Sequence, residues 1–248
     1  MAATKSTQRS ITDDYVRAFD GMRSYQKIRL GYIYGCLVVG FTCDGVREPR
    51  VYKPTFHLHN LAKPFPTVSL AAAHTYRPRS VPITIKFDRH DESLPQMVEY
   101  FSGSCPLVHA SNRSMDLVLA HHSAHLESLR GTVLFPNILE HEIPIYELAY
   151  FGDVDGALKL AERTADLLAS APEEQVYRFS GESKKGWFDQ LNSDFQSIHD
   201  SVASSIADLK LNTLEHYKEA VAFNTCPAAS SNRHDHSTHR RSLGLGQV

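Results

Sequence analysis

The first third of the chain has the apolar and polar patterns of β-strands. Residues 28–42 are mostly β-branched or aromatic and become apolar on both faces after Ile33, which predicts one central strand. The pair Asp44–Gly45 that follows is a turn signal. Three further strands are predicted over residues 51–60, 67–76 and 81–87, and the last of them alternates most regularly. We therefore expect an antiparallel meander of four strands over about residues 28–88.

The middle of the chain has the apolar spacing of amphipathic helices. We expect residues 1–10 to be flexible and a first helix to follow Thr12, whose hydroxyl suits a helix cap. Pro144 and Asp153 suit the first positions of two later helices. The later helices are predicted over residues 92–101, 114–129, 145–151 and 154–169. This order predicts an α+β domain over residues 11–172, in which the C-terminal helices cover one face of the sheet.

The C-terminal part is predicted to divide into three segments. Residues 173–186 have the composition of a polar linker, and residues 225–248 that of a disordered tail rich in His, Arg and Ser. Between them, residues 187–224 predict one long amphipathic helix, which packs on the domain, on a protein partner or on a second copy. Its apolar stripe consists of Phe188, Leu191, Phe195, Ile198, Val202, Ile206 and Leu209.

Charge and composition narrow the class of protein. The chain has 248 residues with 26 Lys and Arg against 28 Asp and Glu, so a dedicated nucleic-acid binder is not expected. Its longest strongly apolar run, residues 35–41, is much shorter than the roughly 20 residues of a membrane-spanning helix. None of its four cysteines forms a C-x-x-C pair, a usage typical of reduced thiols. We expect a cytoplasmic protein that does not enter a membrane.

Histidine is the residue type that suggests chemistry, with 14 in the chain. His57 and His59 are two residues apart on a predicted strand and so share a face. His121 and His125 are four apart on a predicted helix and also lie together. If the two pairs meet, their four neutral imidazoles can bind zinc or a similar divalent metal, and no other cofactor is expected. If the two pairs do not meet, these histidines are simply polar residues at the exposed border of a strand and of a helix.

The other motifs in the sequence are weaker indications of function. The chain has no phosphate-binding glycine loop and no G-x-S-x-G esterase motif. Asp153–Gly156 begins like a calcium loop, but its glycine is misplaced. A group of basic residues suits an anionic partner, although neighbouring acids dilute it. It consists of Arg77, Arg79, Lys86, Arg89 and His90, with Tyr76 beside them.

Two hypotheses of function follow, and the sequence leaves open whether the protein is an enzyme. The first is a non-catalytic protein-interaction protein, of adaptor or immunity type, which uses the open sheet face or the long C-terminal helix. The alternative is a metal-dependent hydrolase built on His57, His59, His121 and His125. Convergence of these four histidines on one point within about 5 Å would favour the hydrolase.

Overall fold

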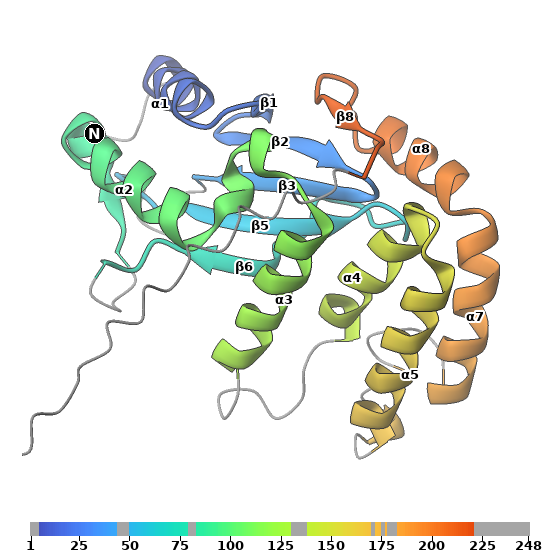
Figure 1. The fold of residues 1–248 in the computed structure, drawn as a ribbon. Helices are drawn as coiled ribbons and strands as arrows, with labels where there is room; N and C mark the ends of the chain where they lie inside the picture. The colour runs from blue at the N-terminus through green and yellow to red at the C-terminus, as the bar shows by residue number, and fades with distance from the viewer. Residues whose placement is uncertain are drawn as a thin grey trace, which may run out of the picture.

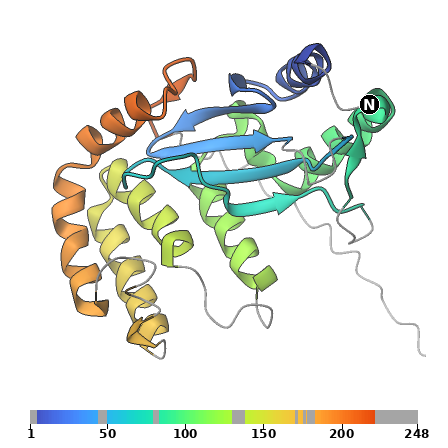
Figure 2. The same cartoon turned by 180° about the vertical axis from the view of Figure 1, so that it is seen from behind.

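The core of the molecule is an antiparallel β-sheet with a layer of helices (Figure 1). The computed structural model describes residues 5–43, 50–78, 83–129, 138–169, 172–174, 177 and 183–220. The strands of the sheet run in the order β1-β2-β3-β5-β6, and Figure 2 shows them side by side from behind. They are β1 (Arg23–Gln26), β2 (Arg29–Tyr34), β3 (Leu37–Thr42), β5 (Thr55–Asn60) and β6 (Ala71–Thr75). A further strand, β8 (His216–Tyr217), pairs with β2 in parallel.

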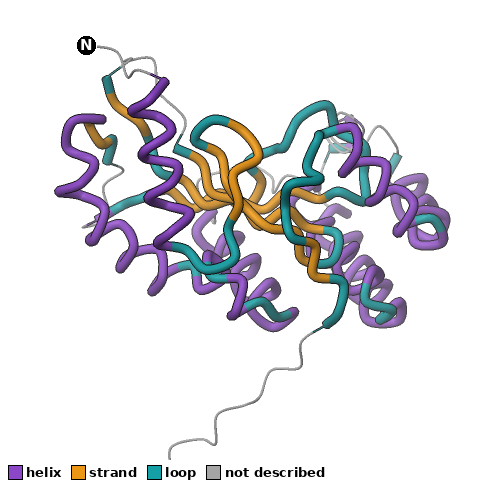
Figure 3. The backbone as a smooth tube through the Cα atoms, turned by 90° about the horizontal axis from the view of Figure 1, so that it is seen from above, coloured by secondary structure: helices purple, strands orange, loops and turns teal. Residues whose placement is uncertain are grey.

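Most of the helices follow the sheet in sequence, so the predicted α+β class is confirmed. Seen from above, the strands cross the middle of the molecule with helices to either side (Figure 3). The helices are α1 (Lys5–Ala18), α2 (His90–Ser104), α3 (Met115–Leu129), α4 (Ile138–Tyr150), α5 (Val154–Ala169), α7 (Lys184–Gln196) and α8 (Ile198–Asp208).

The predicted single strand over residues 28–42 is wrong, because the segment folds as the β2–β3 hairpin. Its turn lies at Gly35 and Cys36, where Gly35 has a φ of 56°, a left-handed conformation that favours glycine. Neither residue of this turn is one of the polar residues that usually indicate a turn in a sequence. The polar partner comes from α4 instead, because Glu147 accepts a hydrogen bond from the Cys36 amide at 2.9 Å.

Strands β2, β3, β5 and β6 form an antiparallel meander, as predicted, but the later strands are shorter than expected and the last predicted strand lies outside it. The segment 51–60 divides into β4 (Val51–Tyr52) and β5, with Pro54 between them. Strand β4 pairs with β7 (Ile85–Lys86) in a separate sheet of two strands. The regular alternation of residues 81–87 therefore gives only the two residues of β7, while Phe87 begins a short 3-10 helix and Ile83 is 39 % exposed. Residues 81 and 82 lie outside the described part.

Helix boundaries differ from the expectation at three places. Helix α1 begins at Lys5, so residues 5–10 are helical and Thr12 lies inside the helix, where its hydroxyl donates to the carbonyl of Gln8. Pro144 also lies inside a helix, α4, which starts at Ile138. The long C-terminal helix is broken at Ser197 into α7 and α8 and ends at Asp208. The predicted tail 225–248 and half of the predicted linker 173–186 lie outside the described residues, and α7 already begins at Lys184 within that linker.

One face of the sheet is held by aromatic contacts with three helices. The Phe41 ring on β3 lies 4.8 Å from Tyr15 of α1 and 4.9 Å from Phe101 of α2, measured between ring centroids. Phe56 of β5 lies 5.0 Å from the imidazole of His121 on α3. These large buried rings fix α1, α2 and α3 on the sheet, which places α3 beside the edge strand β6.

Candidate functional site

The first predicted histidine pair is buried on β5, where His59 also lines a cavity of about 250 Å³. His57 is fully buried against Gly40, where a Cβ atom would lie 2.3 Å from its ring, and within the described chain neither of its ring nitrogens has a hydrogen-bond partner. His59 Nδ1 accepts a hydrogen bond from the amide of Ser69 at 3.1 Å. Burial lowers the pKa of His57 to about 3 and the pKa of His59 to about 4. Both rings are therefore neutral near pH 7.

The second predicted pair lies on α3, one helical turn apart. His121 Nε2 is 3.1 Å from the carbonyl oxygen of Ala72 on β6. His125 Nε2 is 3.2 Å from Oε2 of Glu140 on α4. Both contacts join α3 to a neighbouring element, so the pair helps to fix the helix.

The structure does not bring the two pairs together as a metal site. Among the residues that it describes, the groups of three or more ligand-type side chains within 4.8 Å of one another include none of His57, His59, His121 and His125. Of the four, His125 pairs with a carboxylate, that of Glu140 on α4. The predicted four-histidine centre is therefore not formed.

The apolar stripe predicted as an interaction surface packs inside the chain. Leu191, Ile198 and Val202 are each at most 2 % exposed. The other four members of the stripe are partly buried against the same core. Trp187 is buried as well and donates a hydrogen bond to Glu142 of α4 at 2.7 Å. This part of α7 and α8 thus holds the helical layer together.

A cavity of about 580 Å³ opens between β6 and α3. This volume lies in the range of small-molecule sites, about 300–1,000 Å³. The polar part of its lining includes three histidines, one from β6 and two from α3, together with one arginine. These residues are His74, Arg77, His121 and His125. Leu107, Leu117 and Leu129 contribute an apolar part.

The hydrogen bonds fix which nitrogen of each cavity histidine carries the proton. A carbonyl or carboxylate oxygen only accepts, so His121 and His125 carry hydrogen on Nε2. Tyr100 donates its hydroxyl to the carbonyl of Thr75 at 3.4 Å and therefore accepts from His74 Nε2 at 2.9 Å. In the neutral ring each Nδ1 is then a bare acceptor.

Burial keeps two of these rings neutral. It lowers the pKa of His121 to about 4 and also lowers the pKa of His74, whose charged form is further disfavoured by Arg77 and His125. The cavity therefore presents hydrogen-bond acceptors beside one permanent cation, the Arg77 guanidinium. None of the described residues that line it is acidic.

The two serine hydroxyl groups of the cavity lining already donate to backbone carbonyls. Ser104 donates to the carbonyl of Tyr100 at 2.7 Å, and Ser128 donates to the carbonyl of His125 at 2.6 Å. A nucleophilic serine needs a base that accepts its proton, whereas these two hydroxyls donate hydrogen bonds to backbone carbonyl oxygens. Neither serine is therefore placed as an activated nucleophile.

Sequence reasoning missed His74 and placed Arg77 only in a general basic group. No motif marks His74, because the contact with α3 depends on the position of β6 at the sheet edge. Of the same basic group, Arg89 pairs with Glu92 at 3.1 Å, and Arg79 lies outside the described residues. Arg77 is therefore the member of this group that reaches the cavity.

Comparisons with known families, with curated proteins and with solved structures found no match, so function is argued from the site itself. In the described ranges, no helix combines the length and the apolar character needed to cross a membrane.

Proposed function

We propose that this chain is a non-catalytic binding protein that takes up a small aromatic acid with an N–H donor in the cavity between β6 and α3. The observation that carries the proposal is the proton arrangement of His74, His121 and His125. All three Nε2 atoms face protein acceptors, so three Nδ1 acceptors remain for a ligand. They match the N–H group of the ligand.

The other lining residues match the acid group and the apolar body of that ligand. Arg77 matches an acid group, because a guanidinium binds a carboxylate through two parallel hydrogen bonds. Leu107, Leu117 and Leu129 match an apolar body. The absence of an acidic group from the described lining removes the main source of repulsion for an anion.

Two other predicted functions receive less support. A protein interface on the long C-terminal helix would need an apolar stripe that instead contacts the chain's own core. A hydrolase on four histidines would need ligands that converge, and the two pairs are apart. The expectation of a reducing compartment, such as the cytoplasm, is supported by Cys36 and Cys105, which are buried and form no disulfide in the described part of the chain.

Isothermal titration calorimetry with a panel of aromatic acids tests the proposal. Indole-3-acetate supplies an acid group, a ring N–H and an apolar body, and its N-methyl analogue lacks only the N–H. We expect the analogue to bind about tenfold more weakly, because one lost hydrogen bond in a desolvated site costs about 1.4 kcal/mol. Arg77→Gln is expected to weaken binding of both acids by about tenfold or more.

Arg89→Gln is the matched control, since Arg89 is also an exposed arginine but does not line the cavity. It should leave the affinity unchanged. The proposal is overturned if no aromatic acid of the panel binds, or if Arg77→Gln binds indole-3-acetate as tightly as the unaltered chain.

A further inference from the structure

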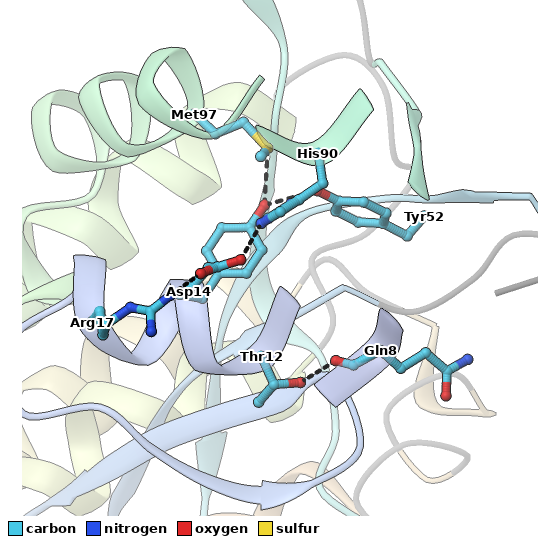
Figure 4. A network of polar contacts seen from close by, with 8 residues as sticks. Gln8, Thr12, Asp14, Arg17, Tyr52, His90 and Met97 are labelled. Atoms are coloured by element: carbon cyan, nitrogen blue, oxygen red, sulfur yellow. Dashed lines mark hydrogen bonds and ion pairs between the residues drawn. The ribbon is translucent and has the colours of Figure 1, made fainter. Parts of the chain in front are cut away.

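Three ligand-type side chains meet between α1 and α2, and none of them lines the cavity described above. Figure 4 shows Asp14 and His90 of this group side by side. Asp14 lies on α1, while His90 and Asp91 begin α2. One ligand atom of each lies within 4.8 Å of the others. The His90 side chain is 4 % exposed and that of Asp14 15 %, whereas Asp91 is exposed.

Two phenols lie on the Nδ1 side of His90. Tyr15 donates its hydroxyl to the Met97 sulfur at 3.0 Å and lies 3.3 Å from the Tyr52 hydroxyl. The Tyr52 oxygen lies 2.6 Å from His90 Nδ1 and can accept its hydrogen. With that hydrogen on Nδ1, the Nε2 atom can bind a metal ion.

The other ring nitrogen of His90, Nε2, is buried and faces Asp14. It lies 3.3 Å from Oδ2 of that carboxylate. A cation bound by both atoms takes the place of the proton that an imidazole and a carboxylate share at this distance.

The neighbours orient both carboxylates as ligands. Arg17 pairs with Oδ1 of Asp14, which directs Oδ2 toward His90. Asp91 adds a second carboxylate from the first turn of α2. A metal-bound histidine usually donates its other N–H to a fixed partner, and the contact of His90 with Tyr52 has this form.

We propose that Asp14, His90 and Asp91 bind one first-row divalent cation. One imidazole and two carboxylates suit Mn²⁺ or Zn²⁺ better than Mg²⁺ or Ca²⁺, which prefer oxygen ligands alone. The cavities of about 580 and 530 Å³ are lined by other residues, so the ion is a clamp between α1 and α2. It stabilises the folded chain by mass action.

Electron paramagnetic resonance of Mn²⁺ tests the site on the full chain, because the signal reports the free aqueous ion. Mn²⁺ is the suitable probe, since histidine groups elsewhere in the chain bind it less strongly than Zn²⁺ or Cu²⁺. We expect one bound ion per chain. Asp14→Asn and Asp91→Asn should each weaken binding by at least about tenfold, and Tyr52→Phe by about tenfold.

Asp13→Asn and Glu92→Gln are matched controls, because each is an exposed acid adjacent to a ligand in sequence and outside the cluster. Both should bind Mn²⁺ like the unaltered chain. Asp91 is exposed, so its variant folds even where a change at His90 does not. The proposal is overturned if the unaltered chain does not bind Mn²⁺, or if Asp14→Asn and Asp91→Asn bind it with unchanged affinity.

Discussion

Two histidine pairs with equally suggestive spacing have different surroundings in this molecule. On β5, His57 is enclosed and has a partner at neither ring nitrogen among the described residues, whereas His59 lines a smaller cavity of about 250 Å³. The pair on α3 faces a cavity, and His121 and His125 each have an acceptor at Nε2. Spacing therefore identifies which imidazoles share a face. The hydrogen-bond partner of Nε2 decides whether the ring only packs against its neighbours or offers Nδ1 as an acceptor to a ligand.

The prediction with the largest expected effect on stability tests whether His57 is tightly enclosed. Gly40→Ala places a Cβ 2.3 Å from the His57 ring, and we expect a loss of about 3 kcal/mol in the free energy of unfolding. Urea unfolding measures it. Gly40→Ala combined with His57→Ala should lose less than the sum of the single changes, because the clash is then absent.

Gly103→Ala is the control for this first prediction, because nothing lies within 4 Å of a Cβ built there on α2. It should not destabilise the chain, since alanine is favoured over glycine in a helix. Equal effects of Gly40→Ala with and without His57 would show that the packing account of the β5 pair is wrong.

The same substitution in both pairs sharpens the comparison. His121→Leu removes the donor to the Ala72 carbonyl, and we expect a loss of about 2 kcal/mol at pH 7. His57→Leu removes two ring nitrogens that have no partner, so the free energy of unfolding should stay level or rise. Denaturant unfolding of the two variants side by side gives the difference. A larger loss for His57→Leu would contradict the account.

Acid pH provides a third test of the enclosed pair. The pKa of His57 is about 3 in the folded chain and about 6.5 in the unfolded chain. Between these values only the unfolded chain takes up the proton, so stability falls as the pH is lowered. His57→Leu should reduce this fall by about 1.4 kcal/mol per pH unit between pH 6 and 4.

This comparison is made between variants because other buried groups titrate in the same range. Burial raises the pKa of Glu147 to about 8, so its contribution to stability decreases as the pH rises from its ordinary value toward 8, the opposite sign. That contribution is common to both chains and cancels. If the free energies of unfolding of the unaltered chain and of His57→Leu changed in parallel with pH, His57 would become protonated without unfolding of the chain.

The smallest expected effect on stability belongs to Arg77. We expect Arg77→Gln to change the free energy of unfolding by less than about 0.5 kcal/mol, as is usual for surface positions. Its effect should fall on ligand affinity instead. A loss of more than about 1 kcal/mol in thermal or urea unfolding would assign Arg77 a structural role and remove the reason for an acidic ligand.

The sequence predicts the fold class well because the strands and helices have distinct apolar periods. It does not predict the β2–β3 hairpin, since the turn at Gly35 is apolar and its polar partner, Glu147, is more than a hundred residues away. The short strands β1 and β8, which complete the edge of β2, carry too few residues for a periodic signal. The alternation around Ile85 was misleading, because only two residues pair there.

The candidate site could be predicted in part. The spacing of His121 and His125 places them together on α3, and this follows from helix geometry alone. His74 joins them because β6 is the edge strand beside α3, which depends on the order of strands in the sheet. Asp91 resembles an ordinary acid at a helix start, and nothing in the sequence indicates that Asp14 lies beside it.

Nitrogen NMR of the imidazole rings tests the central claim most directly, because it distinguishes the protonated from the bare ring nitrogen. At pH 7, the account predicts hydrogen on Nε2 and a bare Nδ1 in His74 and His121, whose pKa values burial lowers. Addition of indole-3-acetate should move these two Nδ1 signals and leave those of His57 in place. Hydrogen on Nδ1 of either ring in the free protein, or ligand binding that leaves both Nδ1 signals unmoved, would contradict it.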